Sequence, residues 1–343
     1  MQRREFFKLT AGAAAVAGLS FTLSESAQAA DLAEVPMNAG KKGAPLTKNW
    51  GDNPHEHCTT YSPDFADKNL WIRKDNLPLA TYRTNPNQKY PYLYPLAGPH
   101  SMVSVVSESA MPWPHHRGMF CIGLDRVNGG NYWQQTRNDG QILSQGLTVE
   151  SADETKIVWT DSALWKKPEQ DPIISDARKY TIDWRSNDYY VVDFEYALTT
   201  LTEVTVQRTN HGFFGVRVSP ELAPNGGGFL VNSNGQKGQK ETEGKPADWV
   251  AYYGARRFNT SLTEGVAILC APESDWADWP FEGPCPWFTR DYGNISTMPF
   301  NYLPGPFVFQ KDKTFKMKWR SVVFAGTPED VDLTGLWKEY YQG

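Results

Sequence analysis

The stretch that indicates the fold class is Val191-Val192-Asp193-Phe194-Glu195-Tyr196. From Val192 on, apolar and polar residues alternate. Side chains with a period of two lie on opposite faces of a β-strand, so one face of this segment is buried and the other is in water. The same period recurs in Phe315-Lys316-Met317-Lys318-Trp319-Arg320. Strands that are apolar on one face only are typical of antiparallel sheets.

Further strands are predicted on both sides of this stretch. Runs of β-branched and aromatic residues, separated at short intervals by Pro, Gly and Asn, carry the signal. They are residues 70–73, 79–82, 92–94, 119–124, 146–150, 156–160, 179–184, 189–198, 203–207 and 213–218. The residues between them are too few to contain long helices.

A single segment, at the C-terminus, has the pattern of a helix. Thr327 is the expected N-cap, Pro328 opens the first turn, and residues 331–341 place Leu and aromatic side chains on one side. Many strands, short turns and little helix predict an all-β fold, a large antiparallel β-sandwich or jelly-roll with one C-terminal helix. Because no repeat and no linker interrupts them, residues 70–343 are predicted to form a single domain.

The first 29 residues have the pattern of an export signal. Arg3 and Arg4 precede an apolar run, and Ala27-Gln28-Ala29 forms a small-residue cleavage site. Paired arginines indicate the bacterial twin-arginine route, so the protein is expected to be periplasmic or secreted. Residues 30–69 are predicted to be a flexible lead-in. No later apolar stretch is long enough to cross a membrane, so no membrane association is expected.

Composition restricts the partners. The formal net charge of −5 argues against a nucleic-acid partner, which would require a basic face. Most of the thirteen Trp, sixteen Tyr and seventeen Phe are expected in the core, and their number mildly favours a carbohydrate ligand, because aromatic faces stack on the apolar side of a sugar ring. Of the four cysteines, Cys270 and Cys285 are the best candidates for a disulfide, and Cys121 lies in an apolar run that predicts a buried thiol.

The most polar loop is Met111-Pro112-Trp113-Pro114-His115-His116-Arg117-Gly118-Met119-Phe120. The prolines stiffen its entry, and Gly118 permits a backbone conformation or a close approach that a side chain would prevent. Adjacent residues of an extended segment point to opposite faces, so one histidine is expected to face a cleft. We expect this to be His116, with His115 as a supporting or metal-binding residue. The alternative is a core histidine and a surface arginine.

Two other segments have some features of ligand sites. His55-Glu56-His57-Cys58 places two imidazoles on one face of an extended segment, but a metal site needs a further ligand from elsewhere. Residues 225–244 are rich in glycine, yet they lack the order of a phosphate-binding loop and the helix that follows one. They predict a long mobile loop over a cleft.

Three later motifs follow His115-His116-Arg117-Gly118 in a fixed order: Asn210-His211-Gly212-Phe213-Phe214-Gly215-Val216-Arg217, Asn232-Ser233-Asn234-Gly235 with Gly244-Lys245-Pro246-Ala247-Asp248-Trp249, and Arg290-Asp291-Tyr292-Gly293. With this set, the chain from about residue 70 onward resembles the PmoA-like family of bacterial exported proteins. The resemblance implies an all-β fold similar to galactose-mutarotase-like enzymes and a role in polysaccharide breakdown. Some members of that family are lyases or dehydratases that act on uronic-acid residues.

That resemblance implies roles for the polar residues. Removal of a proton next to a carboxylate needs a base, an acid for the leaving oxygen and cations for the carboxylate. His116 or His211 is the expected base, Tyr292 the acid, and Arg117 with Arg290 the carboxylate site. Side chains that bind the sugar are expected to be Asn210, Asn232, Trp249 and His115. The implied partner is an acidic oligosaccharide, with no cofactor.

Four alternatives remain open. The same residues could serve an epimerase-like reaction, because it too begins with proton removal or transfer at a sugar carbon. The chain could be a non-catalytic glycan-binding protein, for which aromatic side chains and a glycine-rich loop suffice. It could instead be a metal-dependent sugar-modifying enzyme with a divalent metal on His115, His116 and His211. Turn formation is an equally good explanation for Asn210 and Asn232, and core packing is a better one for Trp249.

Overall fold

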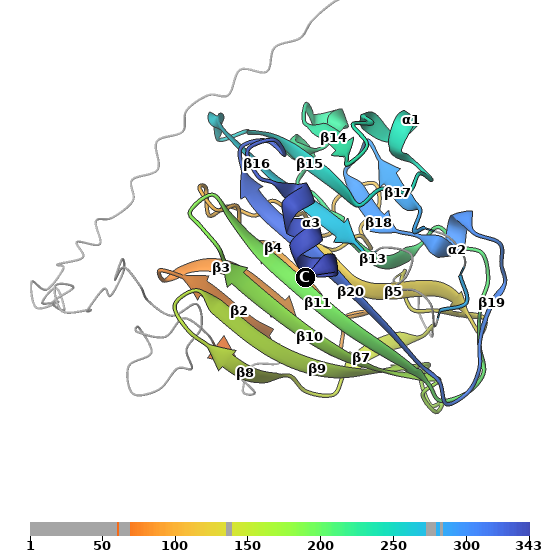
Figure 1. Ribbon diagram of the computed structural model, residues 1–343. Coiled ribbons are helices and arrows are strands. Elements are labelled where there is room, and N and C mark those ends of the chain that lie inside the picture. Colours follow the sequence, from red (N-terminus) through yellow and green to blue (C-terminus); the bar gives the residue numbers. More distant parts are fainter. Residues whose placement is uncertain (1–59, 62–68, 135–138, 272–278, 282–283) are drawn as a thin grey trace, which may run out of the picture. The chain divides into compact units, whose positions relative to one another are not determined.

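The computed structural model describes residues 60–61, 69–134, 139–271, 279–281 and 284–343. The predicted export signal and the His55-Glu56-His57-Cys58 run lie outside the described residues. Within the described ranges the strands form two antiparallel sheets (Figure 1). None of the helices found there is long and apolar enough to cross a membrane. The predicted all-β, antiparallel fold is therefore confirmed.

One sheet has eleven strands. Its main path runs through β1 (Thr60–Tyr61), β2 (Asn69–Lys74), β3 (Leu77–Arg83), β4 (Tyr92–Leu96), β5 (Met119–Val127), β13 (Gly212–Arg217), β18 (Asn294–Thr297) and β17 (Trp287–Arg290). Beside this path lie β6 (Gly130–Asn131), β12 (Val204–Val206) and β19 (Phe307–Phe309). β5 and β13 thus lie in the middle of this path, between strands from the first third of the chain and strands from the last third, and they bring the predicted motifs together.

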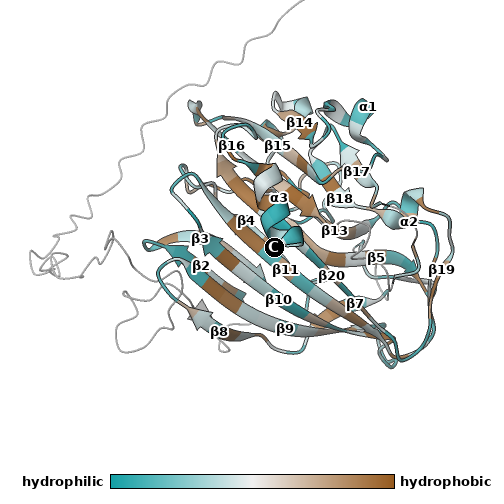
Figure 2. Ribbon diagram, viewed as in Figure 1, coloured by the Kyte–Doolittle hydropathy of each residue, from teal (hydrophilic) through white to brown (hydrophobic). Residues whose placement is uncertain are grey.

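The other sheet has nine strands. Its order is β14 (Phe229–Asn232), β15 (Trp249–Arg256), β16 (Asn259–Cys270), β20 (Thr314–Ala325), β11 (Tyr189–Thr200), β10 (Ile174–Trp184), β9 (Lys156–Lys166) and β7 (Gln141–Ser144), and β8 (Thr148–Ala152) pairs with β9. Hydrophobic and hydrophilic residues follow one another along its long strands (Figure 2). The segments whose residues alternate with a period of two are therefore strands of this sheet, as predicted.

Aromatic rings fill the space between the sheets. Phe194 on β11 lies opposite Tyr180 on one neighbouring strand and opposite Trp319 on the other. Its ring also stacks on Phe214 of the eleven-stranded sheet, with centroids 5.4 Å apart. All four rings are buried, so the alternating residues that predicted the fold form its core.

The C-terminal helix α3 (Leu333–Gln342) begins later than predicted. Asp332 caps it and accepts a hydrogen bond from the backbone N–H of Gly335 at 2.8 Å. Thr327, the predicted N-cap, instead donates to Asp330 in the turn before the helix. α3 packs on β15, β16 and β20 and covers a second apolar cluster on the outer face of the nine-stranded sheet (Figure 1).

Residues 225–244 do not form the predicted long loop. They contain the end of the short helix η4 (Pro224–Gly226), strand β14 and helix α1 (Gly238–Thr242). A further short helix, α2 (Pro299–Tyr302), follows β18. Neither α1 nor α2 was predicted, because segments of four or five residues are too short to show a helical period.

Three cysteines of the described part are free thiols, namely Cys121, Cys270 and Cys285. The predicted Cys270–Cys285 disulfide is not formed. Burial, together with the neighbouring Cys270, raises the pKa of the Cys285 thiol. The prediction that Cys121 is a buried thiol is confirmed.

Candidate functional site

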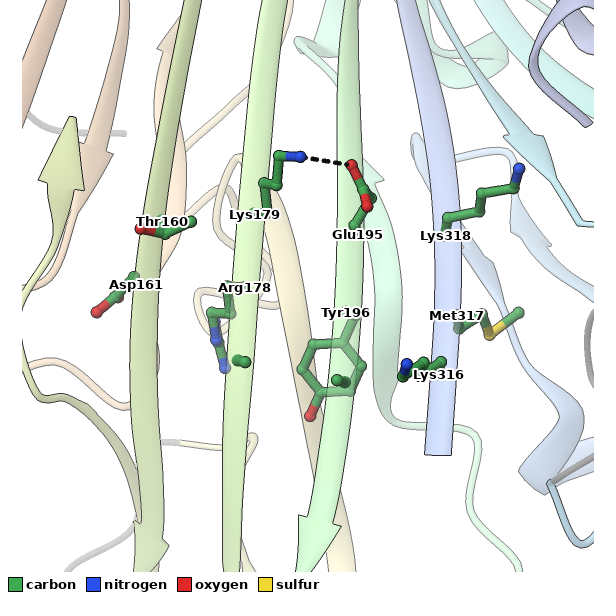
Figure 3. Close-up of a pocket in the computed structure, with 11 residues that line it drawn as sticks. Thr160, Asp161, Arg178, Lys179, Glu195, Tyr196, Lys316, Met317 and Lys318 are labelled. Atoms are coloured by element: carbon green, nitrogen blue, oxygen red, sulfur yellow. Dashed lines mark ion pairs between the residues drawn. The ribbon is translucent and has the colours of Figure 1, made fainter. Parts of the chain in front are cut away.

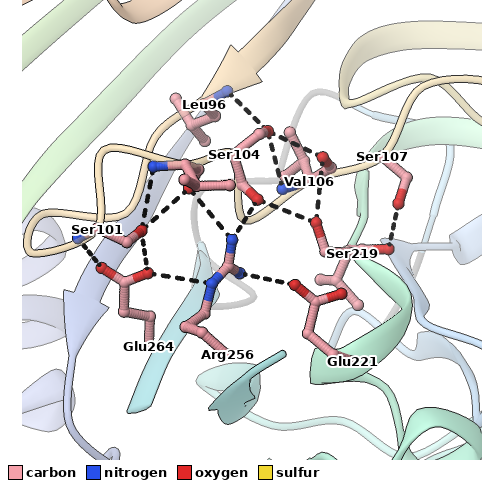
Figure 4. A network of polar contacts seen from close by, with 11 residues as sticks. Leu96, Ser101, Ser104, Val106, Ser107, Ser219, Glu221, Arg256 and Glu264 are labelled. Atoms are coloured by element: carbon pink, nitrogen blue, oxygen red, sulfur yellow. Dashed lines mark hydrogen bonds and ion pairs between the residues drawn. The ribbon is translucent and has the colours of Figure 1, made fainter. Parts of the chain in front are cut away.

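The segment that carries the two histidines crosses from β4 to β5, and its first half is fixed to the nine-stranded sheet (Figure 4). Glu264 on β16 is fully buried and accepts hydrogen bonds from the backbone N–H groups of His100 and Ser101, at 3.0 and 2.9 Å. Arg256 on β15 forms ion pairs with Glu264 and Glu221, each at 3.3 Å. A carboxylate and a guanidinium inside the protein therefore hold the loop in place.

The second half of the loop ends at Gly118, as the sequence predicts. Gly118 has a φ of +53°, and a Cβ atom there would overlap the carbonyl oxygen of Leu93. This close approach holds Gly118, the residue before β5, against β4. It thereby fixes the end of the loop on which the two histidines lie. His116 is 5% exposed and His115 is half-buried, with ring centroids 4.6 Å apart in an edge-to-face arrangement.

The site lies on the face of the eleven-stranded sheet that points away from the nine-stranded sheet. Phe214 on β13 points to the core, where its ring lies 4.8 Å from Trp319. The next residue, Gly215, leaves room for the ring of Phe120 on the opposite face. Because side chains alternate along a strand, Arg217 shares that opposite face. His115 and His116 lie over it, next to Trp133 at 5.9 and 5.7 Å.

A histidine–aspartate pair joins β5 and β13. His211, directly before β13, has its Nδ1 atom 2.8 Å from Oδ2 of Asp125 on β5. The hydroxyl group of Thr209 donates to the other oxygen of Asp125. Burial raises the pKa of Asp125, but the hydrogen bonds from His211 and Thr209 outweigh it and hold the pKa below its usual value. Asp125 is therefore ionised and fixes one nitrogen of His211, which leaves the other free.

Tyr292 completes the group from the turn between β17 and β18. Gly293, with a φ of +96°, allows the tight turn that projects it. Its ring lies 6.1 Å from His116 at an interplanar angle of 27°. Burial raises the pKa of Tyr292 despite the nearby Arg290 and Arg217, so its hydroxyl group keeps its proton at neutral pH.

Arg217 is a buried cation without an acidic partner among the described residues. It is 3% exposed, and its guanidinium lies 4.6 Å from the centre of the Tyr292 ring. Nη2 donates to the carbonyl oxygen of Met111 at 3.3 Å, whereas Nε and Nη1 have no hydrogen-bond partner. Burial lowers the pKa of Arg217. A buried guanidinium left in this state makes the site electropositive.

The same environment keeps both loop histidines neutral. Burial, His211 and Arg217 lower the pKa of His115 to about 4. Burial, His115 and Arg217 lower the pKa of His116 to about 2. Protonation of either ring would add a positive charge beside Arg217, so the two imidazoles act as polar, uncharged groups at neutral pH.

A cavity of about 260 Å³ opens beside the loop. It is lined by Ser109, Pro114, His115, Arg117 and Gln134. The histidine in its wall is therefore His115 and not, as predicted, His116, which is buried. Arg117 lies over the ring of Tyr92 at 5.7 Å, and no carboxylate of the described part is within ion-pairing distance of it. The nearby Glu108 is bound to Arg83 at 3.0 Å. Arg117 therefore brings an unpaired positive charge to the wall that it shares with His115.

Arg290, predicted to hold a carboxylate with Arg117, is already paired. It forms an ion pair with Glu243, which also accepts a hydrogen bond from the hydroxyl group of Tyr302 at 2.8 Å. Arg290 is close enough to Tyr292 to influence its pKa, but its own charge is balanced. Near Tyr292, the cation without an acidic partner in the described part is instead Arg217.

Asn232 and Trp249 lie apart from the histidines. The side chain of Asn232 bonds the backbone N–H groups of Asn234 and Gln236 in a turn. Trp249 packs with the α3 cluster and donates to Thr334, whereas the next residue, Val250, points to the opposite face of the sheet and belongs to the main core. Turn formation and packing, the two structural alternatives, account for both. Asn210 is half-buried beside His211.

Two residues of the candidate site were not identified from the sequence. Asp125 follows the apolar run of β5, and Arg217 ends the motif that contains His211. A carboxylate and a guanidinium near the ends of two buried strands could have indicated a polar site in the sequence. Their meaning depends on which partner each one has, and the sequence does not show this.

The described residues contain no group of three or more His, Cys, Asp or Glu side chains placed to hold a metal ion. His115, His116 and His211 lie near one another, with His115 and His211 ring centroids 6.4 Å apart. A metal on these three histidines remains a hypothesis, and His55 and His57 lie outside the described part.

A larger cavity, of about 510 Å³, lies on β9, β10, β11 and β20 (Figure 3). Lys179 and Glu195 form an exposed ion pair there at 3.5 Å, and Lys318 follows on the next strand. None of the predicted site residues lines it. The two cavities therefore differ in chemistry: only the smaller one has a titratable histidine in its wall.

The model of DUF6807, a family of unknown function, matches residues 69–338. No curated protein matches the chain. The chain is similar to a polysaccharide lyase, at 10% identity and a TM-score of 0.29, over 73% of this chain and 31% of that chain. It is also similar to a GalM/aldose epimerase homologue from C. elegans, at 7% identity and a TM-score of 0.28, over 83% and 98%. The chain thus spans about a third of that lyase's length, and both TM-scores are too low to support an argument.

Proposed function

The chain belongs to DUF6807, a family of unknown function, and we propose that it is a carbohydrate-active carbon–oxygen lyase. Its substrate would be a uronic-acid-containing oligosaccharide, which it would cleave or dehydrate by β-elimination. The proposal has to rest on the site itself, since the family assigns no reaction.

The observation that carries the proposal is the unbalanced charge of the site. Arg117 and Arg217 have no acidic partner among the described residues, and Asp125 is occupied by His211 and Thr209. Buried cations are stable only when an anion or hydrogen-bond acceptors compensate them. A sugar carboxylate would supply that anion, and Arg117, in the wall of the cavity, is the side chain best placed to bind it.

His211 is the base that the geometry favours. With its Nδ1–H donated to Asp125, its Nε2 lone pair is free to remove the proton from the carbon next to the carboxylate. His116 is less suitable, because its pKa of about 2 makes it a weak base. The electron pair of the C–H bond becomes the new carbon–carbon double bond as the β C–O bond breaks. Arg117 and Arg217 stabilise the charge that builds on the carboxylate.

Tyr292 is the acid in this scheme. Its raised pKa keeps the phenol protonated, so it can give its proton to the leaving oxygen. The products are a 4,5-unsaturated uronate and either a shortened sugar chain or water, and the proton taken by His211 later returns to solvent. Trp133, beside both loop histidines, would exclude water from the reacting carbon.

The proposal is tested by incubating the purified protein with fragments of alginate, pectin, ulvan and glycosaminoglycans. Elimination creates a conjugated enol ether, whose ultraviolet absorbance should rise with at least one fragment and stay flat with His211→Asn. The matched control is His100→Asn, because His100 also contacts an aspartate, Asp188, at 2.9 Å, but outside the site. No rise with any fragment, or equal activity in His211→Asn, would contradict the proposal.

A further inference from the structure

Trp113 is an exposed aromatic side chain beside the smaller cavity. It is 46% exposed, and its neighbour Met111 is 77% exposed. Its ring centroid lies 6.1 Å from that of His115, which lines the cavity together with Pro114. Large side chains at the surface of a protein usually bury more of their area, so an indole in this place has a face available to a ligand.

The backbone around Trp113 is fixed. Its N–H donates to the carbonyl oxygen of Ala110 at 3.2 Å, and its own carbonyl accepts from the N–H of His116 at 3.1 Å. Pro112 and Pro114 on either side restrict φ at their positions. The indole is therefore carried by a rigid turn, and ordering it on a ligand costs little conformational entropy.

The chemistry of the surroundings identifies the ligand class. Arg117 in the cavity wall is suited to a carboxylate, and an exposed indole is suited to a flat apolar surface. A pyranose ring presents its axial C–H groups as such a surface, and a chain of uronates places one ring beside the carboxylate of the next. The polar hydroxyl groups at the rim of the ring stay in water.

We infer that Trp113 is a stacking platform for the sugar ring next to the uronate that occupies the His115–Arg117 cavity. This inference rests on the proposed function for the position of that uronate. It makes the site selective for oligosaccharides over single uronic acids, because only an oligosaccharide reaches both Arg117 and Trp113.

The test is calorimetric binding of uronic acid monomers, dimers and tetramers to the wild-type protein and to Trp113→Ala. Stacking of an aromatic pair typically changes affinity by about 3- to 10-fold. We expect a loss of this size for dimers and tetramers and no change for the monomer. Trp113→Phe should retain most of the affinity. Trp71→Ala is the matched control, since Trp71 is 37% exposed on β2, outside the site.

The outcomes separate this inference from the proposed reaction. A length-dependent loss of binding in Trp113→Ala supports the platform even if the protein eliminates nothing, which would contradict only the lyase proposal. Elimination activity combined with equal affinity of wild type and Trp113→Ala at every length would overturn the platform alone. An equal loss for monomer and tetramer would also overturn it, because the effect would then be a disturbance of the cavity.

Discussion

The Nδ1 atom of His211 lies 2.8 Å from Oδ2 of Asp125, and this contact joins two residues that are 86 positions apart in the sequence. It fixes the orientation of the imidazole and the nitrogen that carries the proton. The reactivity proposed for His211 therefore depends on Asp125, although only the histidine would touch the substrate.

Replacement of Asp125 by Asn tests this dependence. The amide removes the charge and, by donating an N–H, favours the wrong tautomer of His211. We expect kcat for elimination to fall by roughly 10²- to 10⁴-fold. Steady-state kinetics on the reactive fragment measure the change, and Asp188→Asn, beside the exposed His100, serves as the control. Retention of more than about a tenth of kcat in Asp125→Asn would be inconsistent with this role.

Replacement of Arg217 by Met separates function from stability. Because Arg217 is buried without an acidic partner, an apolar side chain of similar length should leave the free energy of unfolding unchanged or raise it. Elimination should nevertheless be weakened by about 10- to 100-fold in kcat/KM, since a positive charge near the carboxylate is lost. Urea denaturation and kinetics on the same preparation measure both quantities.

The control for Arg217→Met is Arg178→Met. Arg178 is equally buried, but it forms a bidentate pair with Asp176 at 2.7 and 2.8 Å. Removal of this partner leaves a buried carboxylate unpaired and should cost about 3–5 kcal/mol. Equal destabilisation by the two substitutions would mean that Arg217 has a structural anion partner after all.

The loop histidines predict how stability depends on pH. Their pKa values of about 4 and about 2 lie below the usual value of 6.5, so the unfolded chain binds protons that the folded protein does not. The stability that their neutral state contributes is complete above pH 6.5. It is lost as the pH falls from 6.5 toward about 4 for His115 and toward about 2 for His116. For one histidine the slope is at most about 1.4 kcal/mol per pH unit.

His115→Asn should therefore reduce the fall in unfolding free energy between pH 6.5 and pH 4. Chemical denaturation at several values in this interval gives the slope, with His100→Asn as the control for an exposed histidine. A steeper or unchanged slope in His115→Asn would show that the ring is protonated in the folded protein.

The anchoring of the loop predicts a large cost for Glu264→Gln. Glu264 compensates the buried Arg256 and accepts bonds from the loop at His100 and Ser101. We expect a loss of about 3 kcal/mol or more in the free energy of unfolding. Glu195→Gln, which breaks the exposed pair with Lys179, should change it by less than about 1 kcal/mol. Similar values for both would contradict the anchoring role.

The alternation in residues 191–196 was sufficient to predict the antiparallel, all-β fold, because a period of two is a property of each strand by itself. The start of α3 was misplaced since Thr327 and Asp332 are both good caps, and only the packing of Leu333 and Leu336 on the sheet decides between them. The order of strands in the two sheets depends on long-range pairing and was not predictable from local patterns.

The candidate site was predictable in part. His115, His116, His211 and Tyr292 come together because their segments flank β5, β13 and β17 of one sheet. The state of each arginine was not predictable. Arg290 is balanced by Glu243, which lies 47 residues away in the sequence, whereas Arg217 has no such partner in the described part.

Proton NMR of the reaction in D₂O is the direct test of proton removal by His211. We expect the signal of the proton on the carbon next to the carboxylate to disappear from one uronate oligosaccharide and a vinyl proton signal to replace it. His211→Asn should leave the spectrum unchanged. Persistence of that proton in every uronate tested with the wild-type protein would contradict β-elimination by this protein.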